Sequence, residues 1–155
     1  MESLGYPPHI TLAICDDVEI SELLSVFDFA VARLGRTRVR FESLSYFEET
    51  DNIVLWAVPT LPNTIRSVQK LIHSRIDPNL CHPHYRLDSW VPHCSLATAI
   101  APSRRTEAVA LANRPLDPFE VVFDVADCVS FTPVRIIDER DLPESAREDA
   151  TEDAD

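Results

Sequence analysis

The stretch Pro8-His9-Ile10-Thr11-Leu12-Ala13 recurs later in the chain, with small changes, as Pro92-His93-Cys94-Ser95-Leu96-Ala97. Both copies read His-x-[Thr/Ser]-Leu-Ala directly after a proline, and the two histidines lie 84 positions apart. In a β-strand, residues two positions apart lie on the same face. Each copy, read as a strand, therefore presents an imidazole beside a hydroxyl, while Ile10 and Leu12, or Cys94 and Leu96, point to the other face. The repeat predicts two imidazole–hydroxyl pairs that face each other.

Two imidazole–hydroxyl pairs suit acid–base chemistry on a phosphate. A neutral imidazole can accept a proton from water, and a protonated imidazole can donate one to a leaving alkoxide. The hydroxyls of Thr11 and Ser95 can donate hydrogen bonds to non-bridging phosphate oxygens. The pattern predicts His9 and His93 as the catalytic pair and Thr11 and Ser95 as phosphate-binding residues. This scheme needs neither a metal ion nor a cofactor.

The rest of the chain alternates between helical and strand periodicity, which is typical of the α+β class. The motif recurs after about half of the chain, each time followed by a helix and then by β structure. This predicts two pseudo-twofold-related lobes, each with an antiparallel sheet and flanking helices, around a central cleft. The expected helices span residues 20–34, 60–76 and 102–113. The expected strands span residues 8–15, 37–47, 52–58, 92–100 and 134–138, and we expect residues 118–132 to form one long strand or two strands with a bend.

The acidic charge is concentrated at the C-terminal end of the chain. The formal net charge is −12, and residues 139–155 hold eight acidic residues against two arginines, a net of −6. We therefore predict a domain over residues 1–138 and a disordered acidic tail over residues 139–155. An acidic body argues against an extended nucleic-acid surface, since such surfaces neutralise many phosphates. It still permits a nucleotide or an RNA end in a local pocket.

Neither a membrane-spanning apolar run nor a signal-peptide pattern is present in the sequence. The irregular spacing of the cysteines favours free thiols in a cytoplasmic protein. The stretch Cys81-His82-Pro83-His84 does not have the spacing of a zinc site, so we expect no metal there. The four cysteines are Cys15, Cys81, Cys94 and Cys128.

Several further side chains are candidates for contact with a substrate or for packing. Tyr85 and Arg86 precede the second motif and could stack on a base and pair with phosphate, with a plain solvated loop as the alternative. Tyr6 precedes the first motif and could reach the mouth of the cleft. We expect His73 at the surface, and Trp56, Trp90 and Cys94 in packing roles. Three arginines alternate along one expected strand and therefore share a face: Arg36, Arg38 and Arg40. This face is either a solvated outer face or a source of local positive charge.

The paired motif resembles that of the 2H phosphoesterase superfamily, which includes 2′-5′ RNA ligase-like proteins and cyclic phosphodiesterases. The resemblance covers residues 5–135 and includes the helix after the first motif, the strand at 52–58 and the sequence Trp90-Val91-Pro92-His93. It implies a bilobal α+β fold whose motif strands line a central cleft. By position, it implies that His9 and His93 form the catalytic pair and that Thr11 and Ser95 bind phosphate.

The sequence departs from the family pattern at two points. Ser95 stands where threonine is commoner, and it keeps the hydroxyl. The first motif lies close to the first residue, whereas family members usually have a strand and a helix before it. We therefore expect the first lobe to lack that strand and helix, and the open sheet edge to allow self-association.

Together these observations predict a metal-independent phosphoesterase that hydrolyses the 2′,3′-cyclic phosphate of a nucleotide or RNA end. The roles of base and acid stay open between His9 and His93. One alternative is 2′-5′ RNA ligase-type end joining. Another is a non-catalytic nucleotide-binding or scaffold protein that retains the cleft.

Overall fold

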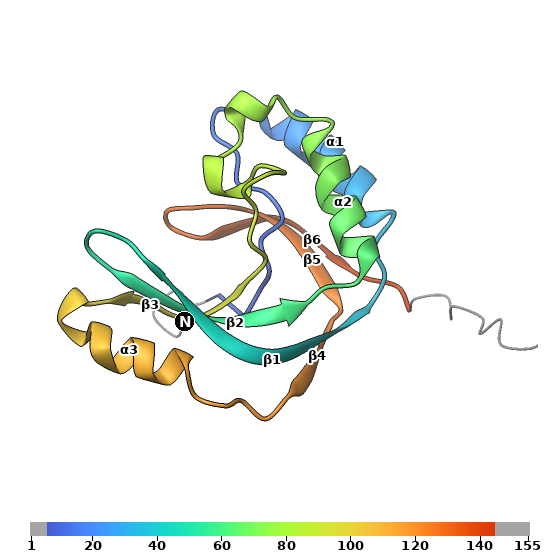
Figure 1. Ribbon diagram of the computed structural model, residues 1–155. Coiled ribbons are helices and arrows are strands. Elements are labelled where there is room, and N and C mark those ends of the chain that lie inside the picture. The colour runs from blue at the N-terminus through green and yellow to red at the C-terminus, as the bar shows by residue number, and fades with distance from the viewer. Residues whose placement is uncertain (1–5, 145–155) are drawn as a thin grey trace, which may run out of the picture.

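The computed structural model describes residues 6–144, and within them the chain forms three α-helices and two antiparallel sheets (Figure 1). The α+β class is therefore confirmed. The segment over residues 118–132, expected as one long strand or as two strands with a bend, forms two strands, and these belong to different sheets. In chain order the elements are α1 (Ile20–Val31), β1 (Thr37–Glu48), β2 (Ile53–Thr60), α2 (Asn63–His73), the short 3-10 helices η2 (Pro78–Leu80) and η3 (Pro83–Tyr85), β3 (Cys94–Ile100), η4 (Pro102–Arg104), α3 (Arg105–Ala112), β4 (Phe119–Phe123), β5 (Val125–Ser130) and β6 (Arg135–Asp141).

The larger sheet has the strand order β3-β2-β1-β4 and is strongly curled (Figure 1). A β-bulge at Glu42 interrupts the pairing of β1 with β2. Val39 and Phe41 lie in the core before the bulge, and Leu44 packs against the same core after it. Because the extra residue reverses the alternation, Ser45 and Phe47 point to the opposite face. That opposite face carries His93 and Ser95 of the second motif.

The main core receives apolar side chains from both motifs. Ile10 and Leu12 of the first motif pack against it, and Cys94 of the second motif is buried within it. This confirms the packing role predicted for Cys94. Leu96 was expected on the same face but is 43% exposed, because it is the extra residue between the β2–β3 pairs of Ser95 and Ala97. The buried members of this core are Val39, Phe41, Ala57, Leu61, Ile65 and Cys94.

The first motif is extended but is not a ladder-forming strand, so the strand expected over residues 8–15 is wrong. Its one bridge pairs Cys15 with Cys81. The segment is held instead by single contacts with the loop between α2 and β3. The backbone N–H of Asp16 donates to the Leu80 carbonyl at 2.9 Å, and that of His82 donates to the Ile14 carbonyl at 2.9 Å.

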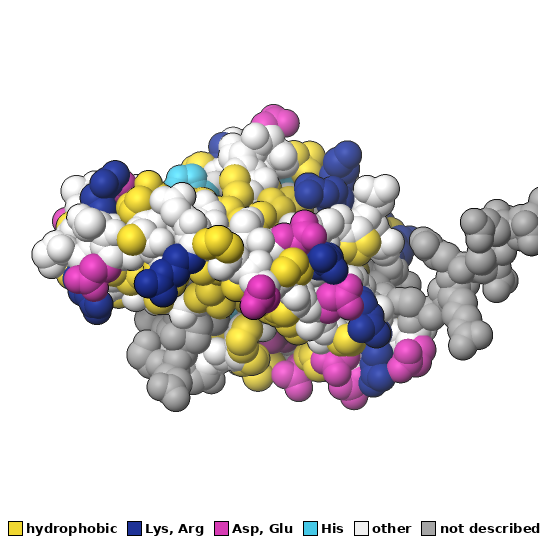
Figure 2. Space-filling view, turned by 60° about the horizontal axis from the view of Figure 1, so that its bottom comes forward, with side chains coloured by type: hydrophobic (Ala, Val, Ile, Leu, Met, Phe, Trp, Pro, Cys, Tyr) yellow, Lys and Arg dark blue, Asp and Glu magenta, His cyan; other side chains and the backbone are white. Residues whose placement is uncertain are grey.

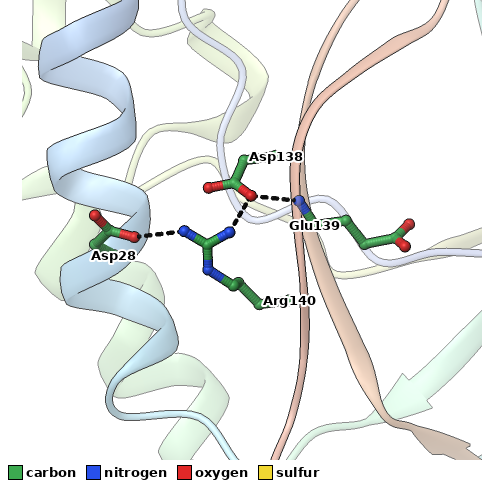
Figure 3. Close-up of polar contacts among 4 residues, drawn as sticks. All are labelled: Asp28, Asp138, Glu139 and Arg140. Atoms are coloured by element: carbon green, nitrogen blue, oxygen red, sulfur yellow. Dashed lines mark hydrogen bonds and ion pairs between the residues drawn. The ribbon is translucent and has the colours of Figure 1, made fainter.

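The smaller sheet, β5 and β6, is joined to α1 by an ion pair (Figure 3). Arg140 on β6 donates from Nη2 to Asp28 Oδ1 of α1 at 3.3 Å and from Nη1 to Asp138. Leu142 just beyond the strand is buried, at 5% exposure. The expected start of the acidic tail at residue 139 is therefore wrong, since residues 139–144 belong to the folded part. Residues 145–155 of that tail lie outside the described residues.

On the face that Figure 2 shows, basic and acidic side chains are interspersed. Arg36 pairs with Glu144, and the other two arginines of the alternating row also pair with glutamates on or beside β1. Exposed pairs of this kind add little stability but do neutralise the row. Within residues 6–144, no helix is both long and apolar enough to cross a membrane.

Candidate active site

The two motif histidines are oriented by the same local device. His9 Nδ1 lies 2.9 Å from the carbonyl oxygen of Pro7, and His93 Nδ1 lies 2.8 Å from that of Val91. Because a carbonyl can only accept, each Nδ1 must carry the hydrogen, and we assign the proton there on that basis. In the neutral ring, Nε2 is then the nitrogen with a free lone pair. Each motif therefore fixes its imidazole through the carbonyl two residues earlier.

An aromatic environment surrounds His93. Its ring centroid lies 5.0 Å from Phe47 and 5.8 Å from Trp56, both in edge-on geometry. The Tyr85 ring lies 6.3 Å away. Burial among these rings lowers the pKa of His93 below its ordinary 6.5, and the Val91 carbonyl partly opposes this. His9 lowers the pKa further, so the two imidazoles are close enough to repel each other when both are protonated.

The sheet register places these aromatic residues beneath the second motif. Ser95 on β3 is paired with Trp56 on β2, so the hydroxyl and the indole share a face. Phe47 reaches the same face because of the bulge at Glu42, and its ring stacks on Trp56 with a centroid distance of 4.8 Å. His93, one residue before β3, continues that face by alternation. The imidazole and hydroxyl of the second motif are thus presented together, as predicted.

The first motif is tied to the loop before β3 through Thr11. The indole Nε1 of Trp90 donates to the Thr11 carbonyl at 3.0 Å. The Thr11 side chain hydrogen-bonds to the Tyr85 hydroxyl, and this partly offsets the rise in the pKa of Tyr85 that burial causes. Tyr85 therefore lies between the two motifs, beside both Thr11 and His93.

The other two expected substrate contacts have structural partners of their own. Tyr6 lies against His9, with ring centroids 4.8 Å apart, and its hydroxyl donates to Asp127 on β5. Burial, followed by the Asp127 hydrogen bond, raises the pKa of Tyr6. Arg86 donates from Nε to the Cys81 carbonyl at 3.0 Å. The structure thus places Tyr6 beside His9 of the first motif. The Nε of Arg86, in contrast, binds the backbone of the loop between α2 and β3.

Two buried polar residues of α2 form hydrogen bonds with the backbone of the segments that carry the site. His73, expected at the surface, is only 6% exposed, and Gln69 is only 3% exposed. Gln69 Nε2 donates to the Tyr85 carbonyl at 3.2 Å. Burial lowers the pKa of His73, and a hydrogen bond with the Leu12 backbone opposes this. Gln69 and His73 are one helical turn apart and share the buried face of α2 with Ile65 and Val68. Their i, i+4 spacing was the sequence signal that could have predicted that both are buried.

A family model described as the 2′-5′ RNA ligase superfamily matches residues 3–132 of the chain. The protein belongs to this superfamily, which is that of the 2H phosphoesterases. The match spans both histidine motifs and every element from α1 to β5. The resemblance inferred from the two motifs is therefore confirmed. No protein with a curated description matches the chain.

Proposed function

We propose that this member of the 2′-5′ RNA ligase superfamily hydrolyses the 2′,3′-cyclic phosphate of a nucleotide or RNA end. The observation that carries the proposal is the matched orientation of His9 and His93, each held through Nδ1 with Nε2 left for chemistry. Superfamily membership supports phosphoesterase or ligase-like activity in general. The hydrolytic reaction and the roles of individual residues are our inference.

The environment of His93 makes it the better general base. Burial keeps its imidazole neutral to lower pH than an ordinary histidine, so Nε2 can accept a proton from the attacking water. The water oxygen bonds to phosphorus as one of the two bridging P–O bonds breaks. A protonated His9 then donates its Nε2 proton to the leaving ribose oxygen. Each proton transfer of this kind typically contributes a rate factor of about 10²–10⁴.

The hydroxyls of Thr11 and Ser95 would stabilise the charge that develops on the non-bridging oxygens. Tyr85 and Tyr6 flank the two motifs and offer rings on which a base can stack. We propose Arg86 as a further contact to phosphate through the guanidinium nitrogens that do not bind the Cys81 carbonyl. We place the protein in the cytoplasm, because its four thiols are free.

RNA 2′-5′ end joining is a second candidate, and the name of the superfamily favours it. Joining requires a surface that holds two RNA ends. The net charge of −12 and the ion pairs of Arg36, Arg38 and Arg40 favour a small substrate instead. Binding to a nucleotide without turnover is the remaining alternative.

The test is turnover of 2′,3′-cyclic AMP, CMP, GMP and UMP in EDTA by the wild type, His9→Ala and His93→Ala. His84→Ala is the matched control, because this exposed histidine lies in the loop between α2 and β3, outside both motifs. We expect the wild type and the control to release a nucleoside monophosphate and both motif variants to be inactive. Near-normal turnover by either motif variant would refute the mechanism. Joining of RNA ends without hydrolysis would establish the ligase alternative, and tight binding without product would establish the non-catalytic one.

A further inference from the structure

Two thiols meet where the first motif segment crosses the loop between α2 and β3. Cys15 Sγ lies 3.7 Å from Cys81 Sγ. The two residues form an isolated antiparallel bridge, and both are free thiols. The segments that they join are 66 positions apart in sequence. A long-range contact between two thiols, with no other ladder pair around it, is an unusual way to fasten this segment.

The backbone geometry at this bridge suits a disulfide. The hydrogen bonds of the bridge flank the pair, from Asp16 N to the Leu80 oxygen and from His82 N to the Ile14 oxygen. Cys15 and Cys81 are therefore a non-hydrogen-bonded pair, the kind in which opposed Cα atoms are only about 4.5 Å apart. That separation falls within the Cα range of natural disulfides. The sulfurs can bond after a short approach, without a rearrangement of the backbone.

We propose that Cys15 and Cys81 are a redox-active dithiol site that a small-molecule disulfide oxidises reversibly to an intramolecular disulfide. The Cys15 thiolate attacks one sulfur of the oxidant, forming a mixed disulfide and releasing one thiol. The Cys81 thiolate then attacks the sulfur of Cys15, forming the protein disulfide and releasing the second thiol. Two electrons and two protons pass from the protein to the oxidant, and a dithiol reductant reverses the reaction.

Access decides which cysteine reacts first. Cys15 is partly exposed, whereas Cys81 is 2% exposed. Burial, followed by the neighbouring Cys81, raises the pKa of Cys15 from 9.0 to about 12. The thiolate fraction is then lower than for an unperturbed thiol, and the higher nucleophilicity of the more basic thiolate offsets this only in part. The exchange should therefore be slow, accelerating as the pH rises, with Cys15 as the point of entry.

The disulfide would fasten the two segments that carry the candidate site. The first segment runs from His9 and Thr11 to Cys15, and the second runs from Cys81 through Tyr85 toward His93. Cross-linking residues so far apart restricts the unfolded chain and should raise Tm by about 10 °C. Because the sulfurs already touch in the reduced structure, the site geometry should change little. The inference is independent of the proposed reaction, because its test reads thiols and not turnover.

The test is oxidation of the native full chain with excess oxidised glutathione at about pH 8.5, followed by alkylation, mass spectrometry and peptide mapping. We expect two of the four thiols to become protected, and the peptides that contain Cys15 and Cys81 to be joined. Dithiothreitol should restore all four thiols and the lower Tm. The matched control is Cys128→Ala, because Cys128 is a buried cysteine whose charge also influences Cys15. It should form the same disulfide.

The single-cysteine variants separate the two steps of the reaction. Cys81→Ala should accumulate glutathione on Cys15, and Cys15→Ala should react at neither position. Four alkylatable thiols in the oxidised wild type would overturn the proposal. So would a wild type that stops at glutathionylated Cys15, or a map that joins Cys15 to Cys128. The wild-type map decides the matter even where a variant fails to fold.

Discussion

The two tryptophans of the chain make a matched pair for testing how the motifs are held together. Trp90 donates its indole hydrogen to the Thr11 carbonyl, so it links the second motif region to the first. Trp56 is 6% exposed, and its indole nitrogen has no hydrogen-bond partner among the described residues. Replacing either one with phenylalanine removes the same atoms. Only Trp90→Phe removes a hydrogen bond.

The expected difference follows from the energies of those two groups. Trp90→Phe loses a hydrogen bond with a net value of about 0.5–1.5 kcal/mol, whereas Trp56→Phe removes an unpaired buried donor whose desolvation costs about 1–3 kcal/mol. Trp56 is almost fully buried whereas Trp90 is only partly buried, so Trp56→Phe also loses more packing, which opposes part of the difference. The two hydrogen-bonding effects together amount to about 1.5–4.5 kcal/mol, so the free energy of unfolding of Trp90→Phe should still be about 1–3 kcal/mol lower than that of Trp56→Phe.

Urea denaturation followed by far-UV circular dichroism measures this difference without relying on tryptophan fluorescence. With a slope of about 1–3 kcal/mol per molar urea, the midpoint of Trp90→Phe should lie about 0.3–3 M below that of Trp56→Phe. The m-values should be equal, because the exposed surface hardly changes. Equal midpoints, or a lower midpoint for Trp56→Phe, would refute the assignment of the Trp90–Thr11 bond as the tie between the motifs.

Three further results are expected from the same structure. Thr11→Val and Ser95→Ala should each lower kcat about 10²-fold in steady-state assays, because each removes a hydroxyl that we propose as a donor to the phosphate, while Thr98→Val at an exposed position of β3 should not. The pKa of His73 is lowered from 6.5 in the folded state, so the unfolded state binds the proton more readily and stability should fall as the pH drops below 6.5. The loss should be at most about 1.4 kcal/mol per pH unit for this group, and urea titrations of His73→Leu should show a shallower dependence. Because the pKa of His93 is also lowered, the rising acid limb of kcat/KM against pH should lie below 6.5, and a limb above that value would contradict its role as the base.

Side-chain alternation predicted the packing of the motifs even where the strand itself was wrongly predicted. Ile10, Leu12 and Cys94 all contribute to the main core, as the two-residue period requires. The period depends only on an extended backbone, and residues 8–14 are extended without a ladder. Whether an extended segment pairs with neighbours is decided by the rest of the fold. Here the loop between α2 and β3 supplies those contacts.

The bulges could not be read from the sequence. Glu42 and Leu96 are each an extra residue in a ladder, and neither is a glycine that would mark the position. The extra residue Glu42 moves Phe47 to the face of His93, and Leu96, the extra residue of β3, is itself left exposed. The i, i+4 spacing of Gln69 and His73 could have indicated that His73 is buried, but its hydrogen-bond partner, the Leu12 backbone, is far away in the chain. Local patterns do not record contacts of that range.

The central claim is that His9 and His93 act together in one reaction on a cyclic phosphate. A double-mutant cycle tests it most directly, with kcat/KM measured for the wild type, His9→Ala, His93→Ala and the double variant on the best 2′,3′-cyclic nucleotide. Each single variant should lose at least about 10³-fold in kcat/KM, and the double variant should be no worse than the poorer single one. Either single variant within about tenfold of the wild type, or losses that multiply in the double variant, would contradict it.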